Sequence, residues 1–237
     1  MRIIGVEVAG GSPVFSRTLP HGADPHRLVW ERGYRVIRPL SVQGHAPELA
    51  FTVQVVRHGR RISPRIPPRT RSMDPGLDLT DDVTPVVRQR LAAYVIALSS
   101  RGILATQFSD KTAVPGLWGL PGGGIDPGEA AAEAVTREVD EETGQELEIS
   151  HLLDLQTDHW IGRSPSGPIE DFHAVRIIFA GRCPNPTTPV VHDVGGTTGA
   201  AAWIPVDRWS ATRWSASART LLERHLRSLA EAWQDAG

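Results

Sequence analysis

The sequence contains very little cysteine and no long hydrophobic run. Its one cysteine, Cys183, cannot form an internal disulfide or begin a zinc-ribbon site, because there is no second cysteine to join it. A membrane-spanning helix needs about 18 consecutive apolar residues, and no such stretch is present. We therefore expect a reduced, cytoplasmic protein with no membrane partner.

A strong excess of one charge is also lacking. At a formal net charge of −2, the whole chain gives no argument for a nucleic-acid partner. The charges are nevertheless unevenly spread, since residues 1–90 carry 14 Arg and 8 acidic residues, whereas the remainder carries 11 basic and 19 acidic residues. The more acidic part contains the motif that indicates a chemistry.

The amino-terminal part has the pattern of short strands. Tyr34 to Ile37 and Phe51 to Val56 are runs of β-branched residues with partial alternation. Glycine and proline interrupt these runs at several points, including Pro20 to Pro25. We therefore expect a small β-rich domain here.

A proline-rich segment follows, from Gly59 to Asp82. It contains four prolines, with arginines gathered in its first half and Asp81-Asp82 at its end, which is typical of a linker. A chain of 237 residues with 40% apolar residues is long enough for two small domains. We predict a β-rich amino-terminal domain with its linker over residues 1–85 and a second domain over residues 86–237.

The second domain reads as alternating strands and helices. A plausible hairpin turn, Ser99 to Gly102, joins the first two strands, and a loop from Lys111 to Gly124 follows. The last helix has an apolar stripe of Leu222, Leu226, Leu229 and Trp233. The expected strands are 91–98, 103–108, 147–155, 173–180 and 200–206, and the last helix is expected from about Ser215 to Trp233.

The clearest helix is expected from Asp126 to Gly144. Asp126 is a suitable N-cap, Pro127 fits the first helical position, and Glu129 completes a capping box. Gly144 supplies the usual stop. At 100° per residue this helix has three faces. They are a core face of Ala132, Val135 and Val139, a second face of Glu133, Arg137 and Asp140, and an acidic face of Glu138, Glu141 and Glu142 with Ala131 and Ala134 between them.

The acidic face is the candidate site. Three like charges at spacings of three and four repel one another, so a cation must offset them. Oxygen ligands without cysteine or histidine suit a hard ion such as Mg²⁺ or Mn²⁺ rather than zinc. Gly122 to Gly124 would let the backbone approach a metal and a phosphate, and the small alanines would leave room for a bulky anion. This arrangement indicates phosphate chemistry.

The residues from Gly123 to Gln145 resemble the Nudix box. The family pattern is GX5EX7REUXEEXGU, where U is aliphatic, and seven fixed letters make a chance match rarer than about one in ten million per window. One position departs from the pattern, since Gln145 stands where an aliphatic residue is usual. The matching residues are Gly123, Glu129, Arg137, Glu138, Val139, Glu141, Glu142 and Gly144.

The resemblance covers about residues 88–234. It implies an α/β fold, the Nudix α/β/α sandwich with a mixed sheet, next to the small β-rich amino-terminal domain. It also implies a Nudix pyrophosphohydrolase, in which water activated by Mg²⁺ or Mn²⁺ attacks one phosphorus of a nucleoside diphosphate linked to another group. Family members with such extensions often dimerise, so a homodimer is expected.

The resemblance also assigns roles to individual residues. Glu138 and Glu142 become the principal metal ligands, Glu141 becomes an additional ligand, and the carbonyl of Gly122 or Gly123 becomes a backbone ligand. Glu129 and Arg137 become structural supports. The general base stays open, and its candidates are a glutamate of the box or one of the later acids Glu170, Asp171 and Asp193.

Several residues have plainer explanations. Glu170, Asp171 and Asp193 could each be an exposed loop acid, and Trp118 could stack on a base or simply anchor a packed loop. The arginines from Arg57 to Arg71 could grip phosphate or RNA, but a charged run in a proline-rich linker is more often solvated. The remaining histidines show no metal spacing and are interpreted as ordinary polar residues; they are His151, His159, His173 and His192.

The range of possible substrates is reduced mainly by the absence of motifs that mark particular Nudix subfamilies. The zinc ribbon of the NADH-pyrophosphatase type is absent, and Trp160 and Ile161 stand where the ADP-ribose type tends to have proline. The dinucleoside polyphosphate type favours a later tyrosine, but no tyrosine follows Tyr94. Nucleoside triphosphates, nucleotide sugars and similar diphosphates remain. The alternatives are a nucleotide-sensing Nudix protein or an RNA 5′-end-processing enzyme that uses the basic amino-terminal region.

Overall fold

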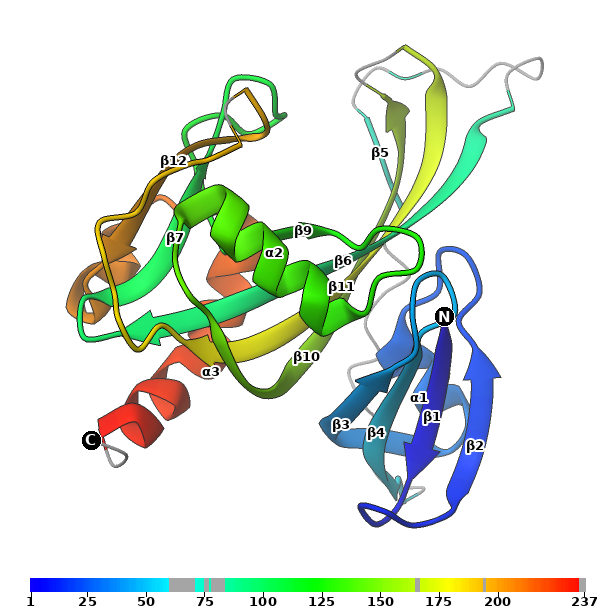
Figure 1. The fold of residues 1–237 in the computed structure, drawn as a ribbon. Coiled ribbons are helices and arrows are strands. Elements are labelled where there is room, and N and C mark those ends of the chain that lie inside the picture. Colours follow the sequence, from blue (N-terminus) through cyan, green and yellow to red (C-terminus); the bar gives the residue numbers. More distant parts are fainter. Residues whose placement is uncertain (60–70, 75–76, 78–83, 165–166, 194, 235–237) are drawn as a thin grey trace. The chain divides into compact units, whose positions relative to one another are not determined.

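The computed structural model describes residues 1–59, 71–74, 77, 84–164, 167–193 and 195–234 (Figure 1). Contacts divide the chain into two compact units that alternate along the sequence. The first contains residues 1–92, 124–131 and 152–177, and the second contains residues 93–123, 132–151 and 178–237. This division follows contacts rather than the linker, because long strands pass from one unit to the other. The predicted boundary between 85 and 86 stays a prediction about which piece folds alone.

The first unit contains a four-stranded sheet in the order β2-β1-β4-β3. β1 and β4 are parallel, and the other two pairs are antiparallel. The β-rich amino-terminal region is thus present in the structure. The strands are β1 (Arg2–Val6), β2 (Pro13–Thr18), β3 (Tyr34–Gln43) and β4 (Ala50–Arg57).

This region also has a helix, α1 (Pro25–Glu31), that the sequence analysis missed. It interpreted Pro20 to Pro25 as a break between strands. The signal was the pair Asp24-Pro25, since the Asp24 side chain accepts a hydrogen bond from the Arg27 backbone N–H at 2.8 Å and proline occupies the first turn. Proline is favoured there because its missing N–H has no partner within the helix in any case.

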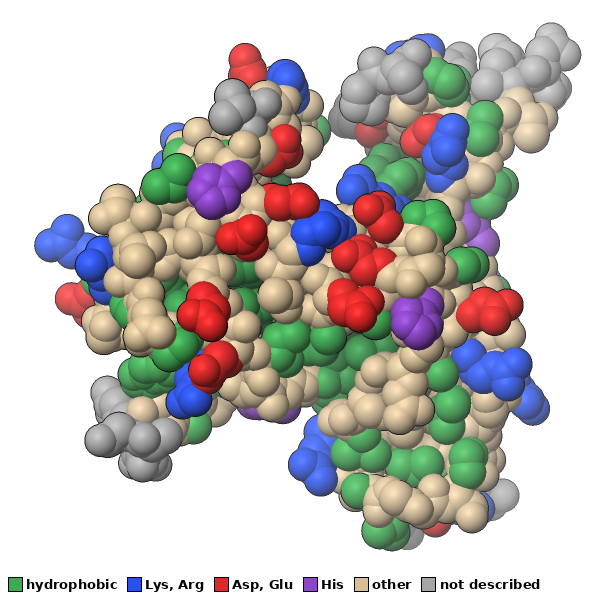
Figure 2. Space-filling view, in the orientation of Figure 1, with side chains coloured by type: hydrophobic (Ala, Val, Ile, Leu, Met, Phe, Trp, Pro, Cys, Tyr) green, Lys and Arg blue, Asp and Glu red, His purple; other side chains and the backbone are tan. Residues whose placement is uncertain are grey.

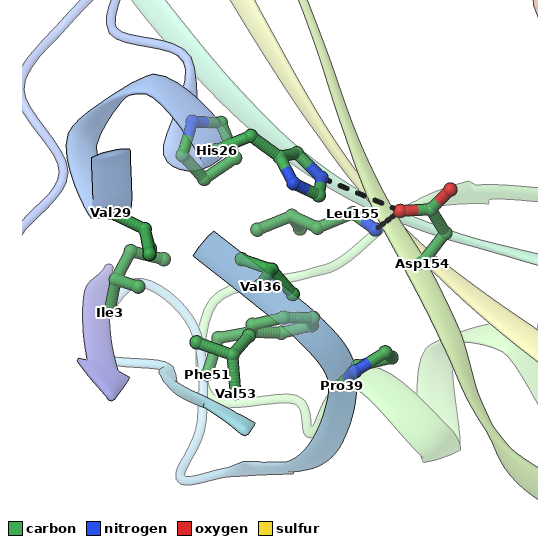
Figure 3. A pocket seen from close by; sticks show the side chains of 10 residues that line it. Ile3, His26, Val29, Val36, Pro39, Phe51, Val53, Asp154 and Leu155 are labelled. Carbon is green, nitrogen blue, oxygen red and sulfur yellow. Dashed lines mark hydrogen bonds and ion pairs between the residues drawn. The ribbon is translucent and has the colours of Figure 1, made fainter. Parts of the chain in front are cut away.

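Alternation along β4 builds a small apolar core. Phe51, Val53 and Val55 are buried, whereas the residues between them are more exposed. Figure 3 shows a shallow apolar pocket of the first unit, where Phe51 and Val53 face Ile3, Val29 and other apolar side chains, with the His26–Asp154 pair at one edge. Burial of such side chains stabilises the sheet by roughly 1.5–3 kcal/mol each.

The larger sheet has eight strands in the order β12-β7-β6-β11-β10-β5, with β8 paired to β7 and β9 paired to β6. It is mixed, since β5 and β10 are parallel and β7 and β12 are antiparallel. The strands are β5 (Arg71–Met73), β6 (Val86–Ser99), β7 (Gly102–Phe108), β8 (Trp118–Gly119), β9 (Gly122–Gly124), β10 (Glu148–Arg163), β11 (Ile169–Arg182) and β12 (Thr198–Ile204).

Two differences from the sequence prediction concern these strands. β5 lies inside the segment interpreted as a linker, most of which falls outside the described residues. β6, β10 and β11 also extend beyond the predicted ranges; the added part of β6, Val86 to Arg90, is exposed throughout and therefore shows no alternation. The predicted hairpin is confirmed, because Ser99 pairs with Gly102.

The two main helices belong largely or wholly to the second unit and complete an α/β/α sandwich. They are α2 (Ala131–Thr143) and α3 (Ala216–Gln234), and Figure 1 shows α2 in front of the strands and α3 behind them. The predicted stripe of α3 is buried at Leu222 and Leu226 and half-buried further along. A short 3-10 helix, Val206–Ala211, precedes α3. Among the described residues, no helix is long and apolar enough to cross a membrane.

α2 begins five residues later than predicted. Asp126 to Glu129 instead form a tight turn, in which the Glu129 N–H donates to the Asp126 carbonyl at 3.0 Å. Pro127 and Gly128 occupy its central positions, and Gly128 has φ of +85°, which no helix allows. The Glu129 carboxylate does accept from the Asp126 N–H at 3.0 Å, as a capping box would, but it closes this turn. The predicted end at Gly144 is confirmed.

The buried face of α2 is also shifted from the predicted one. Val135 and Val139 are fully buried as expected, but Ala132 is exposed, while Ala131 and Ala134 are buried. The two alanines are therefore buried and do not leave space for an anion. A wheel gives the angle between residues but not which side of the apolar arc the sheet covers, so this shift needed the tertiary structure.

Candidate functional site

Glu142 is the central carboxylate of the candidate site. It lies on the last turn of α2, and only 9% of its surface is exposed. Its Oε2 accepts a hydrogen bond from the Gly122 backbone N–H at 2.9 Å, and its Oε1 accepts one from the Thr198 hydroxyl. Both oxygens are thus held by the loop before α2 and by the start of β12.

Burial raises the pKa of Glu142 to about 7, although the hydrogen bonds from Thr198 and Gly122 lower it. The nearby carboxylates of Glu138 and Asp193 raise it further. A cation at the oxygens of Glu142 would oppose this shift and favour the ionised form. The geometry therefore fits a cation-binding position.

Glu138 lies one turn earlier on α2, against the short strand β9, which is called the glycine loop below and consists of Gly122 to Gly124. A Cβ at Gly123 would lie 2.4 Å from the Glu138 carboxyl carbon, so any larger residue there would displace the carboxylate. Gly122 is equally constrained, because a Cβ there would lie 2.2 Å from the Ala93 carbonyl oxygen. The glycine loop is therefore needed for close approach of backbone to carboxylate.

Arg137 pairs with two of the box glutamates. Its Nη1 lies 3.1 Å from Glu138 Oε1 and 3.2 Å from Glu141 Oε2. On the wheel Arg137 belongs to a face with Glu133 and Asp140, but its long side chain reaches the acidic face, as expected for a supporting residue. Glu141 is 45% exposed on its side chain, so it is the most accessible of the three glutamates. Figure 2 shows acidic side chains around a basic one over α2.

A loop before β12 brings Asp193 to the same site. The helix leaves its last carbonyl groups without partners inside the helix, and this loop uses them: the Val190 N–H donates to Thr143, and the His192 and Asp193 N–H groups donate to Glu141. The loop is thereby fixed to the end of α2. Asp193 then lies close enough to Glu142 for its charge to raise the Glu142 pKa.

Comparison with known proteins decides the family. The family model described as the NUDIX domain matches residues 88–225, which is more than half of the chain. The chain belongs to the Nudix family. Among curated proteins it is similar to the nucleoside triphosphatase NudI of Enterobacter sp. (strain 638), with 33% identity over 96 residues that cover 39% of this chain and 68% of that protein. NudI of Klebsiella pneumoniae (strain 342) is 31% identical over the same coverage.

Solved structures of other Nudix proteins are also similar to this chain. A MutT NUDIX hydrolase from Burkholderia pseudomallei is 26% identical, covers 58% of this chain and 98% of its own, and has a TM-score of 0.46. A MutT protein from Methanosarcina mazei Go1 is 20% identical over 59% of this chain and 94% of its own, with a TM-score of 0.47. The family match makes this protein a Nudix hydrolase, with the predicted fold.

The residues of this Nudix site fit a hard divalent cation. The oxygen atoms available at this site belong to the carboxylates of Glu138, Glu141 and Glu142 and to the backbone carbonyl groups of Gly122 and Gly123. Mg²⁺ and Mn²⁺ prefer such ligands, whereas zinc prefers nitrogen and sulfur. The structural observation that supports this fit is the buried Glu142 carboxylate, whose pKa is raised by burial and by the neighbouring carboxylates.

Gln145, the departure from the Nudix box, is buried and fully bonded. Its side-chain amide donates to the Thr143 carbonyl at 3.1 Å and to Thr187 Oγ1 at 2.8 Å, and its oxygen accepts from the Thr187 N–H at 2.9 Å. The sequence showed this residue only as a departure from the usual aliphatic position. The structure shows that hydrogen bonds to the segment before β12 take the place of aliphatic packing.

Restoring the usual aliphatic residue with Gln145→Leu should therefore destabilise the enzyme. The change would leave the buried Thr143 carbonyl without its Gln145 donor and would remove both hydrogen bonds to the exposed Thr187, which costs about 1–3 kcal/mol. For a chain of this size we expect the melting temperature to fall by roughly 3–10 °C. Thermal melts of Gln145→Leu and of the exposed neighbour control Glu146→Gln measure this; a melting temperature at or above wild type would contradict it.

The other candidate residues differ in their surroundings. Trp118 is half-buried, and its backbone pairs with the segment before α3 through the Arg213 carbonyl and the Ser215 N–H. Glu170 Oε1 lies 2.8 Å from Arg88 Nε. Asp171 Oδ1 accepts hydrogen bonds from two histidines. Asp193 is thus the candidate base whose charge acts on a box glutamate.

Sequence reasoning missed the surroundings of the histidines. His159, interpreted as an ordinary polar residue, shares Asp171 with His21, and His173 packs beside them. His21 is separated from Asp171 by 150 residues, and no sequence spacing could have linked them.

Proposed function

We propose that this Nudix hydrolase uses Mg²⁺ or Mn²⁺ to cleave a phosphoanhydride bond in a nucleoside diphosphate derivative such as a nucleoside triphosphate or nucleotide sugar. The observation that carries the proposal is the set of carboxylates at one end of α2. The charges of Glu138 and Asp193 both act on Glu142 there, beside the half-buried Glu141 and the glycines Gly122 to Gly124. Carboxylates this close together attract divalent cations, and the bound cations would in turn attract the negatively charged phosphates of a substrate.

In this proposal Glu138 and Glu142 are the principal metal ligands, Glu141 is an additional ligand, and the Gly122 or Gly123 carbonyl is a backbone ligand. When bound, the metal would lower the pKa of water and neutralise charge on the phosphates. Asp193 is proposed as the general base, because it lies beside Glu142 on a loop fixed to the end of the helix. Arg137 holds Glu138 and Glu141 in place.

The NudI relatives are named nucleoside triphosphatases, so nucleoside triphosphates are the first substrates to test. The experiment is a panel of nucleoside triphosphates, nucleotide sugars and other nucleoside diphosphate derivatives, with the products identified. We expect release of a nucleoside monophosphate that requires millimolar-range Mg²⁺ or Mn²⁺ and is inhibited by Ca²⁺, which binds with longer and looser geometry. Reaction in ¹⁸O water shows which phosphorus is attacked.

Two controls test whether the enzyme cleaves only phosphoanhydride bonds and whether it needs a metal ion. A simple phosphomonoester brings too little negative charge to hold the cations, so nitrophenyl phosphate and nucleoside monophosphates should remain intact. Chelation with EDTA should abolish turnover. Inorganic phosphate released from a nucleoside monophosphate as the main product, or full activity in EDTA, would contradict the proposal.

The two alternative functions, a nucleotide sensor and an RNA 5′-end-processing enzyme, depend on different residues. A nucleotide sensor would not need the complete set of box glutamates present here. An RNA 5′-end-processing enzyme would depend on the amino-terminal arginines, and its binding would weaken strongly with salt. Most of that basic stretch, residues 60–70, lies outside the described residues. A homodimer and a cytoplasmic location stay part of the proposal.

A further inference from the structure

The first unit contains a cluster of histidine and aspartate that the proposed hydrolysis does not use. It consists of His21, between β2 and α1, His159 on β10 and Asp171 on β11. One ligand atom from each of these side chains lies within 4.8 Å of the other two. All three are partly accessible, with 27%, 18% and 18% of their side chains exposed, so an ion could enter from solvent.

The three side chains converge on one oxygen atom. His21 Nε2 lies 2.9 Å from Asp171 Oδ1, and His159 Nε2 lies 2.5 Å from the same Oδ1. The two imidazole rings are edge to face, with centroids 5.2 Å apart. Two ring nitrogens from separate segments are therefore directed at one carboxylate oxygen of a third segment.

We propose that His21, His159 and Asp171 form a binding site for a zinc-type transition-metal ion. Two imidazole nitrogens and one carboxylate oxygen are ligands that zinc prefers, in contrast to the all-oxygen set of the Nudix box. Ligand atoms around a tetrahedral zinc ion lie roughly 3.3 Å apart, given zinc–nitrogen bonds of about 2.0–2.1 Å. To reach this spacing, the two distances between the histidine Nε2 atoms and Asp171 Oδ1 would have to increase by less than about 1 Å. Rotation of the side chains can supply such a change.

The surroundings hold two of the ligands close together. Gly22 has φ of +70°, and a Cβ there would lie 2.6 Å from His159 Cε1, so only glycine lets the backbone after His21 approach His159 this closely. His21 Nδ1 is buried and has no hydrogen-bond partner among the described residues. With that nitrogen enclosed, Nε2 is the ring atom that faces the cluster.

His173 forms the buried back of the cluster. Its ring centroid lies 5.5 Å from that of His21 and 6.0 Å from that of His159. The side chain is completely buried, and its Nδ1 lies 2.9 Å from the amide nitrogen of Gln89. A buried ring therefore closes one side of the cluster.

A bound ion would join segments that are distant in sequence. His21 and Asp171 are separated by 150 residues, and His159 lies on the strand that pairs with β5. The site gives the amino-terminal segment a structural role, because a shared ion would tie the residues before α1 to β10 and β11 in the first unit. Binding to the folded state alone stabilises a protein as ligand concentration rises.

The test uses the full chain, stripped of metal and held in excess Mg²⁺ so that the oxygen-ligand site is satisfied. Zinc is titrated in competition with a chromophoric chelator, and Co²⁺ serves as a spectroscopic probe of nitrogen ligation. We expect one zinc ion per chain and a rise in melting temperature of roughly 5–10 °C at a hundredfold excess over the dissociation constant. His21→Gln, His159→Gln and Asp171→Asn should each weaken zinc binding at least about tenfold.

Matched variants separate this outcome from the proposed hydrolysis. His45→Gln changes an exposed histidine of the same unit and should bind zinc like wild type. Glu142→Gln should also bind zinc like wild type, even where turnover is lost. Melts in the absence of metal show that each variant is folded. The proposal is overturned if wild type shows no such zinc ion, or if folded variants of all three residues bind it as tightly as wild type.

Discussion

Glu142→Gln should lower turnover by roughly 10²–10⁴-fold while the protein stays folded. The substitution keeps the size and helix propensity of the side chain but removes the charge that would bind the metal. Its amide oxygen can still accept from the Gly122 N–H, and its amide nitrogen can donate to Thr198 Oγ1. Because burial already disfavours the charged form, we expect the metal-free melting temperature to be unchanged or higher.

The matched control is Asp140→Asn, which removes an exposed carboxylate from the same helix. Its turnover should stay within about threefold of wild type, since a solvated charge on the opposite side of α2 contributes little. Steady-state kinetics with saturating Mg²⁺, together with thermal melts of both variants, make the comparison. If Glu142→Gln, with its melt unchanged, also turned over within about threefold of wild type, the metal assignment would be wrong.

Asp193→Asn is expected to have the second-largest effect, a loss of roughly 10²–10³-fold in kcat. The asparagine keeps the backbone hydrogen bond to Glu141 that fixes the loop, but its side chain cannot accept a proton from water. A base that is not a metal ligand should leave KM and the Mg²⁺ concentration for half-maximal activity close to wild type. Kinetics over a Mg²⁺ series therefore distinguish a base from a ligand.

Glu170→Gln and Asp171→Asn are the controls for Asp193, because both residues were equal candidates on sequence grounds. Glu170 is paired with Arg88. Partial burial works to raise the pKa of Asp171, but hydrogen bonds and charge from His21 and His159 outweigh it and hold the pKa below the usual value, which makes a weak base. Both variants should keep kcat within about threefold; a large loss in either, with Asp193→Asn active, would move the base to that residue.

The local part of the site could be predicted from the sequence. The box residues lie within one loop and one helix, so their spacing alone places Glu138, Glu141 and Glu142 near one another. Their all-oxygen character then indicates the kind of cation. The α/β/α sandwich followed from the same resemblance, and β4 followed from its alternation.

Local rules conflicted at the predicted start of α2. Asp126, Pro127 and Glu129 fit a helix start, yet Gly128 at positive φ makes the same residues a turn. At Asp24-Pro25 a similar signal did begin a helix. The glycine after the proline is the local difference between the two segments, since His26 follows Pro25. Pairing with Ala46 then holds the turn, because the Ala46 N–H donates to the Glu129 carbonyl and the Ala46 carbonyl accepts from the Gly128 N–H.

Sequence by itself indicated the kind of chemistry, because the spacing of carboxylates along one helix is a matter of periodicity. Tertiary structure decided which later acid comes near Glu142, since the loop that carries Asp193 is hydrogen-bonded to the end of α2. It also decided the burial that raises the pKa of Glu142. The meeting of His21 with Asp171 across 150 residues depends on chain packing, which no local pattern encodes.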